Sequence, residues 1–292
     1  MKHQFARNAC SAILIPAVLV LAGGCSMQQV ASSSTQQVPP SSVVESKTIE
    51  PSATGEPNAV EQSPVIEPKA MDALQKMGAF LQTLKAYEVS FKVSKDEVLD
   101  SGQKVMVDGI SELTVQRPDR LHFSTKIDEA HRDLQFFFDG KTFTIYGNTN
   151  KFYASVPAPA TIHELLDVAQ ERYAIDLPFR DLFAWGTERA DVAAIQSAIY
   201  IGPTKIDNVP CDHYAFRNVD VDWQIWIQQG EKPLPRKLVI TTMDEEQHPQ
   251  YVSNMSWNLS PKINSTAFTF VPSKDAHKIE FAVVEVATEN SK

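Results

Sequence analysis

Cysteine is scarce in this chain, which has three among its 292 residues: Cys10, Cys25 and Cys211. Cys10 falls within an N-terminal leader and Cys25 directly after it, so Cys211 is left without an intrachain partner. The sequence therefore predicts a fold without a disulfide framework. A leftover cysteine can be a reactive thiol, but Cys211 opens an apolar strand, and we favour a buried small hydrophobe.

Motifs for catalysis, metal binding and phosphate binding are also lacking. There is no glycine-rich phosphate loop, no Gly-x-Ser-x-Gly elbow, and no spacing among the seven histidines that suggests a metal site. A kinase-like His-Arg-Asp triplet at 131–133 lacks its companion motifs, and His163-Glu164 lacks the second histidine of a zinc-protease helix. Asp220 and Asp222 share a strand face without a third group nearby. We therefore expect no enzyme activity, no cofactor and no metal.

The apolar run from Ala12 to Ala22 is too short to cross a membrane, because a spanning helix needs roughly 20 apolar residues. Lys2 and Arg7 precede this run, and Gly23-Gly24 follow it. A basic start, a short apolar core and small residues at the cleavage site are typical of a secretory signal peptide, here residues 1–24. The folded part should therefore lie outside the cytoplasm.

Cys25 directly follows the expected cleavage site, as in bacterial lipoprotein signals. In lipoproteins this cysteine carries a diacylglycerol and becomes the mature N-terminus, so we predict lipid attachment, testable with palmitate, at Cys25. The usual leucine lies four residues before the cysteine instead of three, with Ala22 in its place. A plain secretory signal that adjoins a cysteine therefore remains the alternative. Ser26, in place of an aspartate, favours delivery to the outer membrane.

Basic residues are outnumbered by acidic ones, 27 to 36, which gives a formal charge of −9. Loss of Lys2 and Arg7 with the signal leaves 25 basic residues and a charge of −11. An acidic chain argues against a nucleic-acid partner and against a broad basic face on anionic lipid. Membrane contact would come from the lipid anchor, since two or more acyl chains hold a protein stably on a bilayer.

Residues 26–68 are rich in Ser, Gln, Thr, Val, Pro and Glu and contain no aromatic residue. Such a segment cannot bury enough apolar surface to offset its ordering entropy. We interpret 25–69 as a lipidated cysteine with a disordered tether, whose r.m.s. reach would be roughly 35–40 Å. The folded domain is predicted over 70–285.

Apolar periodicity predicts one helix followed by many strands. Spacings of three and four mark one face of a helix at Met71, Leu74, Met77, Leu81 and Leu84. Period-two alternation marks strands near 87–93, 121–127, 143–145 and 238–240. Asp139-Gly140 is a strong hairpin signal between two such runs. The middle is helical instead: Thr161 and Glu164 form a capping-box pattern at the start of 161–172, and Pro178 can begin a second short helix.

Aromatic residues on the strands leave two interpretations open. Phe136, Phe137 and Phe138 are consecutive, and Trp223 and Trp226 lie on opposite faces of one strand. Such residues can fill an ordinary core, or they can enclose a ligand cavity. Because side chains alternate, Phe137 should point outward if its two neighbours point inward.

Short segments resemble the LolA/LolB-like superfamily of periplasmic proteins. Residues 117–121 resemble its Arg-Pro-x-Arg turn, and residues 138–142 its Asp-Gly-Lys hairpin. Residues 235–240 and 268–272 resemble late strands. The segment 223–235 is similar to a narrower branch, the predicted periplasmic proteins of domain of unknown function 2092. The similarity spans residues 70 to 282 and rests mainly on the order of these segments.

The resemblance implies an α+β fold, in which a strongly curved antiparallel β-sheet, a half-barrel, wraps around a long N-terminal helix and short inserted helices. It also implies a hydrophobic cavity for acyl chains, with 165–185 as part of the lid. The predicted lining of this cavity is Leu121, Phe123, Ile127, Leu134, Phe136, Phe138, Phe143 and Trp226.

These observations favour a bacterial lipoprotein whose periplasmic domain binds lipid or an acylated ligand, as a non-catalytic carrier or receptor-like protein. The expected partners are lipid or acyl chains and, through the anchor, the membrane, but not nucleic acid. The alternative is an envelope protein-interaction or stress-sensing module with a packed, ligand-free sheet and a protein partner.

Overall fold

The structure, a computed structural model, describes residues 65–127, 132–175 and 177–281, all within one compact unit. The expected signal peptide, Cys25 and most of the expected tether lie outside these residues. The end of the tether prediction needs correction, because the fold begins before residue 70. Ile66 pairs in parallel with Ala198 of an edge strand, and the backbone N–H of Glu67 donates to the Ala198 carbonyl at 2.8 Å.

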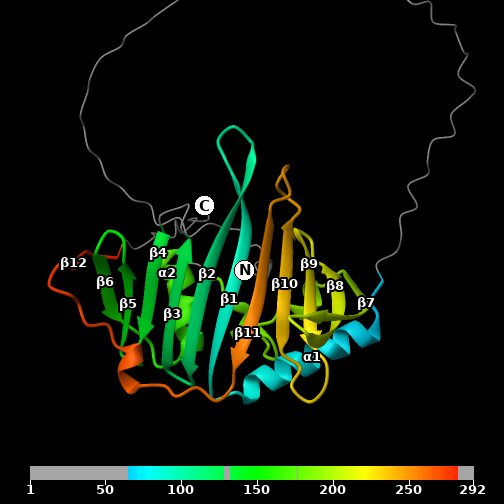
Figure 1. The fold of residues 1–292 in the computed structure, drawn as a ribbon, viewed down its shortest axis with the longest axis horizontal. Coiled ribbons are helices and arrows are strands. Elements are labelled where there is room, and N and C mark those ends of the chain that lie inside the picture. The colour runs from blue at the N-terminus through cyan, green and yellow to red at the C-terminus, as the bar shows by residue number, and fades with distance from the viewer. Residues whose placement is uncertain (1–64, 128–131, 176, 282–292) are drawn as a thin grey trace, which may run out of the picture. The chain divides into compact units, whose positions relative to one another are not determined.

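Within the described part of the chain, twelve strands form one open, curved sheet with the order β12-β6-β5-β4-β3-β2-β1-β11-β10-β9-β8-β7 (Figure 1). Neighbouring strands are antiparallel except for the short edge strand β12, which pairs in parallel with β6. The strands are β1 (Ala86–Val98), β2 (Lys104–Gln116), β3 (Arg120–Ile127), β4 (Arg132–Phe138), β5 (Thr142–Gly147), β6 (Phe152–Pro157), β7 (Ser197–Ile206), β8 (Val209–Arg217), β9 (Val221–Gln228), β10 (Pro235–Thr242), β11 (Gln250–Asn258) and β12 (His277–Lys278).

Helices cover one face of this sheet, which we call the inner face. They are α1 (Pro68–Thr83), α2 (Ile162–Tyr173) and α3 (Asp181–Ala184), with 3-10 turns η2 (Val192–Ala194) and η3 (Ser265–Phe268). α1 runs across one end of strands β7 to β11, and α2 lies behind β3 and β4 in the view of Figure 1. The α+β half-barrel that the resemblance implies is therefore confirmed.

Local sequence signals account for several of these elements. The predicted apolar stripe places Leu74, Met77 and Leu81 of α1 in the core. The Asp139-Gly140 turn is confirmed: Gly140 adopts φ +82°, and the Asp139 carboxylate accepts the N–H of Thr142 at 2.8 Å. A left-handed backbone of this kind costs a glycine no steric strain.

The capping box that opens α2 is also confirmed. The Thr161 hydroxyl accepts the N–H of Glu164 at 3.2 Å, and the Glu164 carboxylate accepts the N–H of Thr161 at 3.1 Å. The two bonds satisfy backbone donors that a helix start otherwise leaves unpaired. Glu164 therefore caps the start of the helix.

Residues 268–272 do not form the late strand that the resemblance implies. Phe268 ends η3 and is buried, and Phe270 packs on the outer face of the sheet. Its ring lies 5.4 Å from Phe137, 5.1 Å from Tyr146 and 5.0 Å from Tyr153. Alternating apolar residues can therefore belong to an irregular segment that packs across a sheet, as well as to a strand within a sheet.

Candidate ligand-binding site

The predicted lining residues of β3, β4 and β5 all lie on the inner face. Phe123, Phe136, Phe138 and Phe143 are at most 1% exposed, Leu121 and Ile127 are buried, and Leu134 is half-buried against the same core. Phe137 points to the outer face, as period two requires, and contacts Phe270 and His122. In β3, β4 and β5, the period-two alternation of side chains therefore correctly predicts which residues face inward and which face outward.

Trp226 does not belong with these residues. Val221, Trp223, Ile225 and Ile227 are the buried, inner residues of β9, so Trp226 is on the outer face. There its ring stacks on His213, with centroids 4.0 Å apart, and the Lys237 ammonium lies 4.8 Å from its centroid. The prediction of Trp226 as lining is wrong for this reason, and Trp223 holds the inner position instead.

A series of aromatic ring contacts connects the inner face of the sheet to the helical segment that covers it. Phe143 lies 6.4 Å from Phe136, and Phe136 lies 5.7 Å from Phe123. Phe179, from the loop before α3, lies 4.6 Å from Phe123 and 6.1 Å from Phe183. The sheet and the helical segment therefore share one continuous apolar interior.

We call residues 162–175 and 177–185, which contain α2 and α3, the lid. Hydrogen bonds hold it near its two ends: the N–H of Ile162 donates to the Pro118 carbonyl at 2.9 Å, and the Gln82 amide donates to the Trp185 carbonyl at 2.7 Å. Between these points, buried residues from both parts of the lid face the sheet: Leu165, Leu166, Ala169, Ile175, Leu177, Phe179 and Leu182. Apolar contact is the main interaction between the lid and the inner face.

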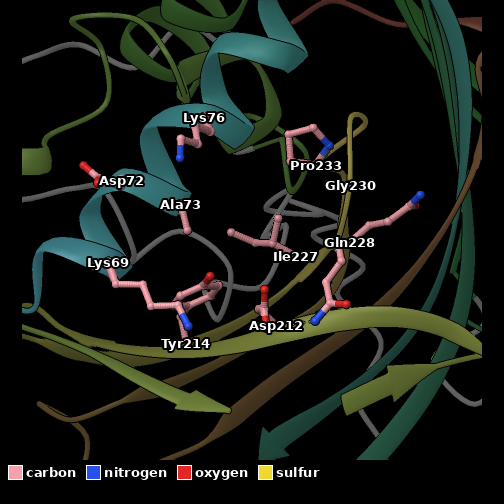
Figure 2. Close-up of a pocket in the computed structure, with 11 residues that line it drawn as sticks. Lys69, Asp72, Ala73, Lys76, Asp212, Tyr214, Ile227, Gln228, Gly230 and Pro233 are labelled. Carbon is pink, nitrogen blue, oxygen red and sulfur yellow. Dashed lines mark hydrogen bonds between the residues drawn. The ribbon is translucent and has the colours of Figure 1, made fainter. Parts of the chain in front are cut away.

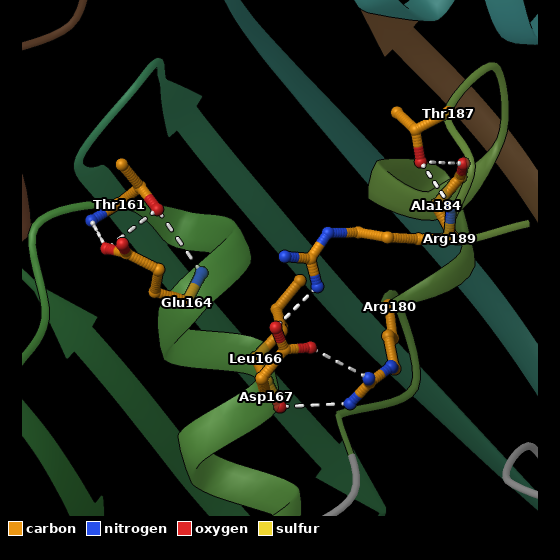
Figure 3. A network of polar contacts seen from close by, with 8 residues as sticks. All are labelled: Thr161, Glu164, Leu166, Asp167, Arg180, Ala184, Thr187 and Arg189. Atoms are coloured by element: carbon orange, nitrogen blue, oxygen red, sulfur yellow. Dashed lines mark hydrogen bonds and ion pairs between the residues drawn. The ribbon is translucent and has the colours of Figure 1, made fainter. Parts of the chain in front are cut away.

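A polar clasp ties the two parts of the lid together (Figure 3). Arg180 donates to the Leu166 carbonyl at 2.9 Å and to the Asp167 carboxylate at 3.1 Å, and Arg189 pairs with the other oxygen of Asp167. Since Asp167 and Leu166 belong to α2 and Arg180 precedes α3, the clasp favours movement of the lid as one piece.

Asp181, at the start of α3, is a titratable group within the lid. Loss of solvation raises its pKa from 3.8 to about 7, and the nearby Arg180 guanidinium opposes this rise only in part. The folded state therefore holds the Asp181 proton more tightly than the unfolded chain does. A group of this kind makes stability fall as pH rises through the interval between the two pKa values, from about pH 4 to about pH 7.

We expect Asp181→Asn to melt at a higher temperature than the unchanged protein at about pH 8, with little difference at about pH 4, where the loss of stability from Asp181 only begins; Asn stays neutral at both pH values. Thermal melts of the two proteins across this range check the prediction. The difference between the two melting temperatures at each pH cancels the effect of every other titrating group. A difference in melting temperature that does not grow with pH would contradict the assignment to Asp181.

The interior is closed in this structure. A cavity of about 10 Å³ lies beneath the lid, close to the space that one water needs. It is lined by Phe91, Ser111, Phe123, Pro178, Phe179 and Tyr251. The Ser111 hydroxyl donates to that of Thr125 at 2.9 Å beside this cavity. An acyl chain could enter only if the lid moved away from Phe123.

A groove of about 510 Å³ lies between α1 and the ends of β8 and β9 (Figure 2). Lys69 and Lys76 of α1 border one side of it, and Asp212 of β8 borders the other. Ala73, Tyr214 and Ile227 also line it, and Tyr214 and Ile227 continue the inner face of the sheet. The groove therefore connects solvent with one end of the apolar interior.

The remaining sequence candidates have structural partners or lie apart. Asp222 accepts two bonds from Arg217, each 2.6 Å long. Cys211 is buried, as predicted, and burial raises the pKa of its thiol. Within 65–127, 132–175 and 177–281, no cluster of three or more His, Cys, Asp or Glu side chains could hold a metal ion. His131 lies outside the described residues.

None of the helices among the described residues is both long enough and apolar enough to cross a membrane.

Comparison of the sequence with known protein families shows the family to which the chain belongs. The sequence pattern of the family described as "Predicted periplasmic protein (DUF2092)" matches residues 70–282. The chain belongs to the DUF2092 family. The match covers the sheet, the lid and all of α1 except its first two residues, so nearly all of the candidate site lies in the part of the chain that matches the family. Among curated proteins, none matches this chain in sequence.

Solved structures offer distant similarity. LprF from Mycobacterium bovis is 16% identical, with a TM-score of 0.42, over 68% of this chain and 97% of that one. The lipoprotein LppX from Mycobacterium tuberculosis is 10% identical, with a TM-score of 0.40, over 68% and 99%. A LolA superfamily protein from Nitrosomonas europaea is 9% identical, with a TM-score of 0.32, over 69% and 97%. These values are low, and we draw no functional conclusion from them.

Proposed function

We propose that this DUF2092 protein is a lipid-anchored periplasmic protein whose half-barrel binds a lipid or another acylated ligand between the inner face and the lid. The role is that of a non-catalytic carrier or receptor. Its anchor would be the diacylglycerol on Cys25, directed to the outer membrane. The observation that carries the proposal is the continuous apolar interior between a curved sheet and a separately clasped helical lid.

Two features support a lid that opens. The lid meets the inner face mainly through side chains such as Phe179 and Leu182, and apolar contacts are non-directional, so an acyl chain can replace them without leaving polar groups unpaired. The clasp at Asp167 and Arg180 holds α2 and α3 together when these contacts separate. The groove beside Tyr214 and Ile227 would offer the chain a way in.

The small size of the closed cavity favours a second candidate, a ligand-free envelope module that binds another protein. An interior filled by side chains such as Phe123 and Phe179 needs no ligand for stability. The two functions differ in whether an apolar ligand enters the domain.

Titration of a neutral fluorescent acyl probe into the non-lipidated chain, residues 26–292, tests the proposal. We expect saturable binding to one site, because the interior is a single apolar compartment, and competition by unlabelled lipid. The protein is prepared without detergent, since detergent would occupy the same space. Absence of probe binding, with no lipid extractable from the protein, would leave the protein-binding module as the better account.

The anchor has a separate test. Cys25→Ala should abolish incorporation of radioactive palmitate and block cleavage by the lipoprotein pathway, because the cysteine sulfur is the acceptor of the diacylglycerol. The unchanged full-length chain, expressed in the same bacterium, is the control. Continued labelling of the Ala variant, with cleavage at the same bond, would show that Cys25 is not the attachment site.

A further inference from the structure

Arg117 is a cation whose best hydrogen-bonding edge is unused. It follows β2, next to Pro118, and continues the inner-face alternation of Leu113 and Val115. Its Nε and Nη2 atoms are buried and have no hydrogen-bond partner. Its guanidinium carbon lies 4.9 Å from the centroid of the Phe183 ring in the lid. The unused edge is therefore enclosed near the junction of the lid and the sheet.

The groups around Arg117 do not neutralise it. Its Nη1 donates to His163 Nε2 at 3.4 Å, and burial together with Arg117 itself lowers the pKa of that imidazole. Burial raises the pKa of the Tyr87 hydroxyl to about 12, and the adjacent Arg117 opposes this rise only in part, so both neighbours are neutral at pH 7. Among the residues that the structure describes, no carboxylate forms an ion pair with Arg117. Burial of an uncompensated charge is costly, which favours an anionic partner at this position.

Arg217 shows in the same molecule what this edge binds. Its Nε and Nη2 atoms donate to the two carboxylate oxygens of Asp222, each at 2.6 Å. This is the bidentate arrangement by which arginine recognises carboxylates and phosphates. The equivalent two atoms of Arg117 are buried and make no hydrogen bond of normal geometry, although the neutral Tyr87 hydroxyl lies close to the guanidinium.

We propose that the Nε–Nη2 edge of Arg117 binds the oxyanion of an acidic amphiphile, a carboxylate or phosphate headgroup whose acyl chain occupies the interior beneath the lid. The apolar surroundings argue for this class of ligand. Phe183 and Tyr87 are about 1% exposed, so an anion that reaches Arg117 gains most if it arrives with an apolar chain. The proposal rests on the proposed function for the chain, and it adds the headgroup and the residue that selects it.

The test compares palmitate with its methyl ester as competitors of the neutral fluorescent acyl probe on chain 26–292. The two ligands have the same chain, and only palmitate carries a charge. We expect the unchanged protein to prefer palmitate by about ten-fold, since a hydrogen bond to a charged group contributes more to affinity than a neutral one by about that factor. Arg117→Gln should remove this preference while leaving affinity for the ester within about two-fold, and Arg117→Lys, which keeps the charge without the two-atom edge, should retain part of it.

Arg217→Gln is the matched control, because it makes the same replacement at an exposed arginine of β8. Thermal melts establish whether each variant folds. If Arg117→Gln does not fold, the palmitate preference of Arg117→Lys is the result that tests the site. Inorganic phosphate is tested separately.

If phosphate stabilises the protein only when Arg117 is present, and palmitate is not preferred over its ester, the site binds a free anion and the proposal of a lipid headgroup is wrong. If palmitate and ester bind the unchanged protein equally and phosphate has no effect, the proposal of an anion site is wrong, while acyl binding is unaffected. Failure of both ligands to bind would count against the proposed function, and the phosphate arm would still decide whether Arg117 holds an anion.

Discussion

Phe123→Asp should leave the domain unfolded. Phe123 is 1% exposed and lies between the rings of Phe136 and Phe179, so an aspartate there would place an unpaired charge at the centre of the closed interior. Burial of such a charge costs far more than the marginal stability of a typical domain. We expect loss of the cooperative thermal transition and of the near-ultraviolet circular dichroism signal. Ser256→Asp, which adds the same charge at an exposed position of β11, is the control.

Phe123→Ala separates packing from ligand binding at the same position. Removal of a buried phenyl ring costs about 3–5 kcal/mol, which lowers the melting temperature of a domain of this size by about 10 °C. An acyl ligand should restore much of that loss, because it fills the space that the ring leaves and binds only the folded state. A melting temperature for Phe123→Ala that does not respond to saturating ligand would mean that the chain does not lie beside Phe123.

Gly78→Ala should displace the end of the lid. A Cβ atom at Gly78 of α1 would overlap the backbone of Gly186, directly after the lid, and come within 2.9 Å of the Trp185 carbonyl carbon. Backbone cannot move aside as a flexible side chain can, so we expect a loss of about 1–3 kcal/mol, as for other overpacked sites. The exposed substitution Gln75→Ala in the same helix should change stability by less than about 0.5 kcal/mol.

Hydrogen exchange locates the effect of Gly78→Ala. Amides of Leu182, Phe183 and Trp185 should exchange faster, whereas those of central strands such as β1 and β2 should keep their protection. Gly186→Ala approaches the contact from the other side and adds the strain of a positive φ, +81°. Uniform loss of protection across the sheet would show that the contact supports the whole fold and not the lid.

Local signals in the sequence predicted much of this fold. The stripe of Leu74, Met77 and Leu81 and the capping box of Thr161 act within a few residues, so sequence spacing is enough to find them. Alternation also placed Phe136 and Phe138 inward and Phe137 outward. In each case the relevant partner is nearby in the chain or the period of the element decides the outcome.

The misplaced and missed residues depend on contacts between distant segments. β9 carries large side chains on both faces, so alternation cannot tell which tryptophan is inside, and Trp226 was assigned to the wrong face. Closure of the interior by Phe179 depends on a loop 56 positions after Phe123, which no short pattern reports. Arg117 was visible as part of an Arg-Pro turn, but its unpaired edge is a property of the assembled lid and sheet.

Native mass spectrometry of the non-lipidated chain 26–292, exported to the periplasm and purified without detergent, shows whether an acyl ligand occupies the half-barrel. We expect a population whose mass exceeds that of the polypeptide by one lipid or fatty acid, which is released on denaturation and replaced by added acyl ligand. A clean polypeptide mass that does not change when acyl ligands are added would contradict this expectation.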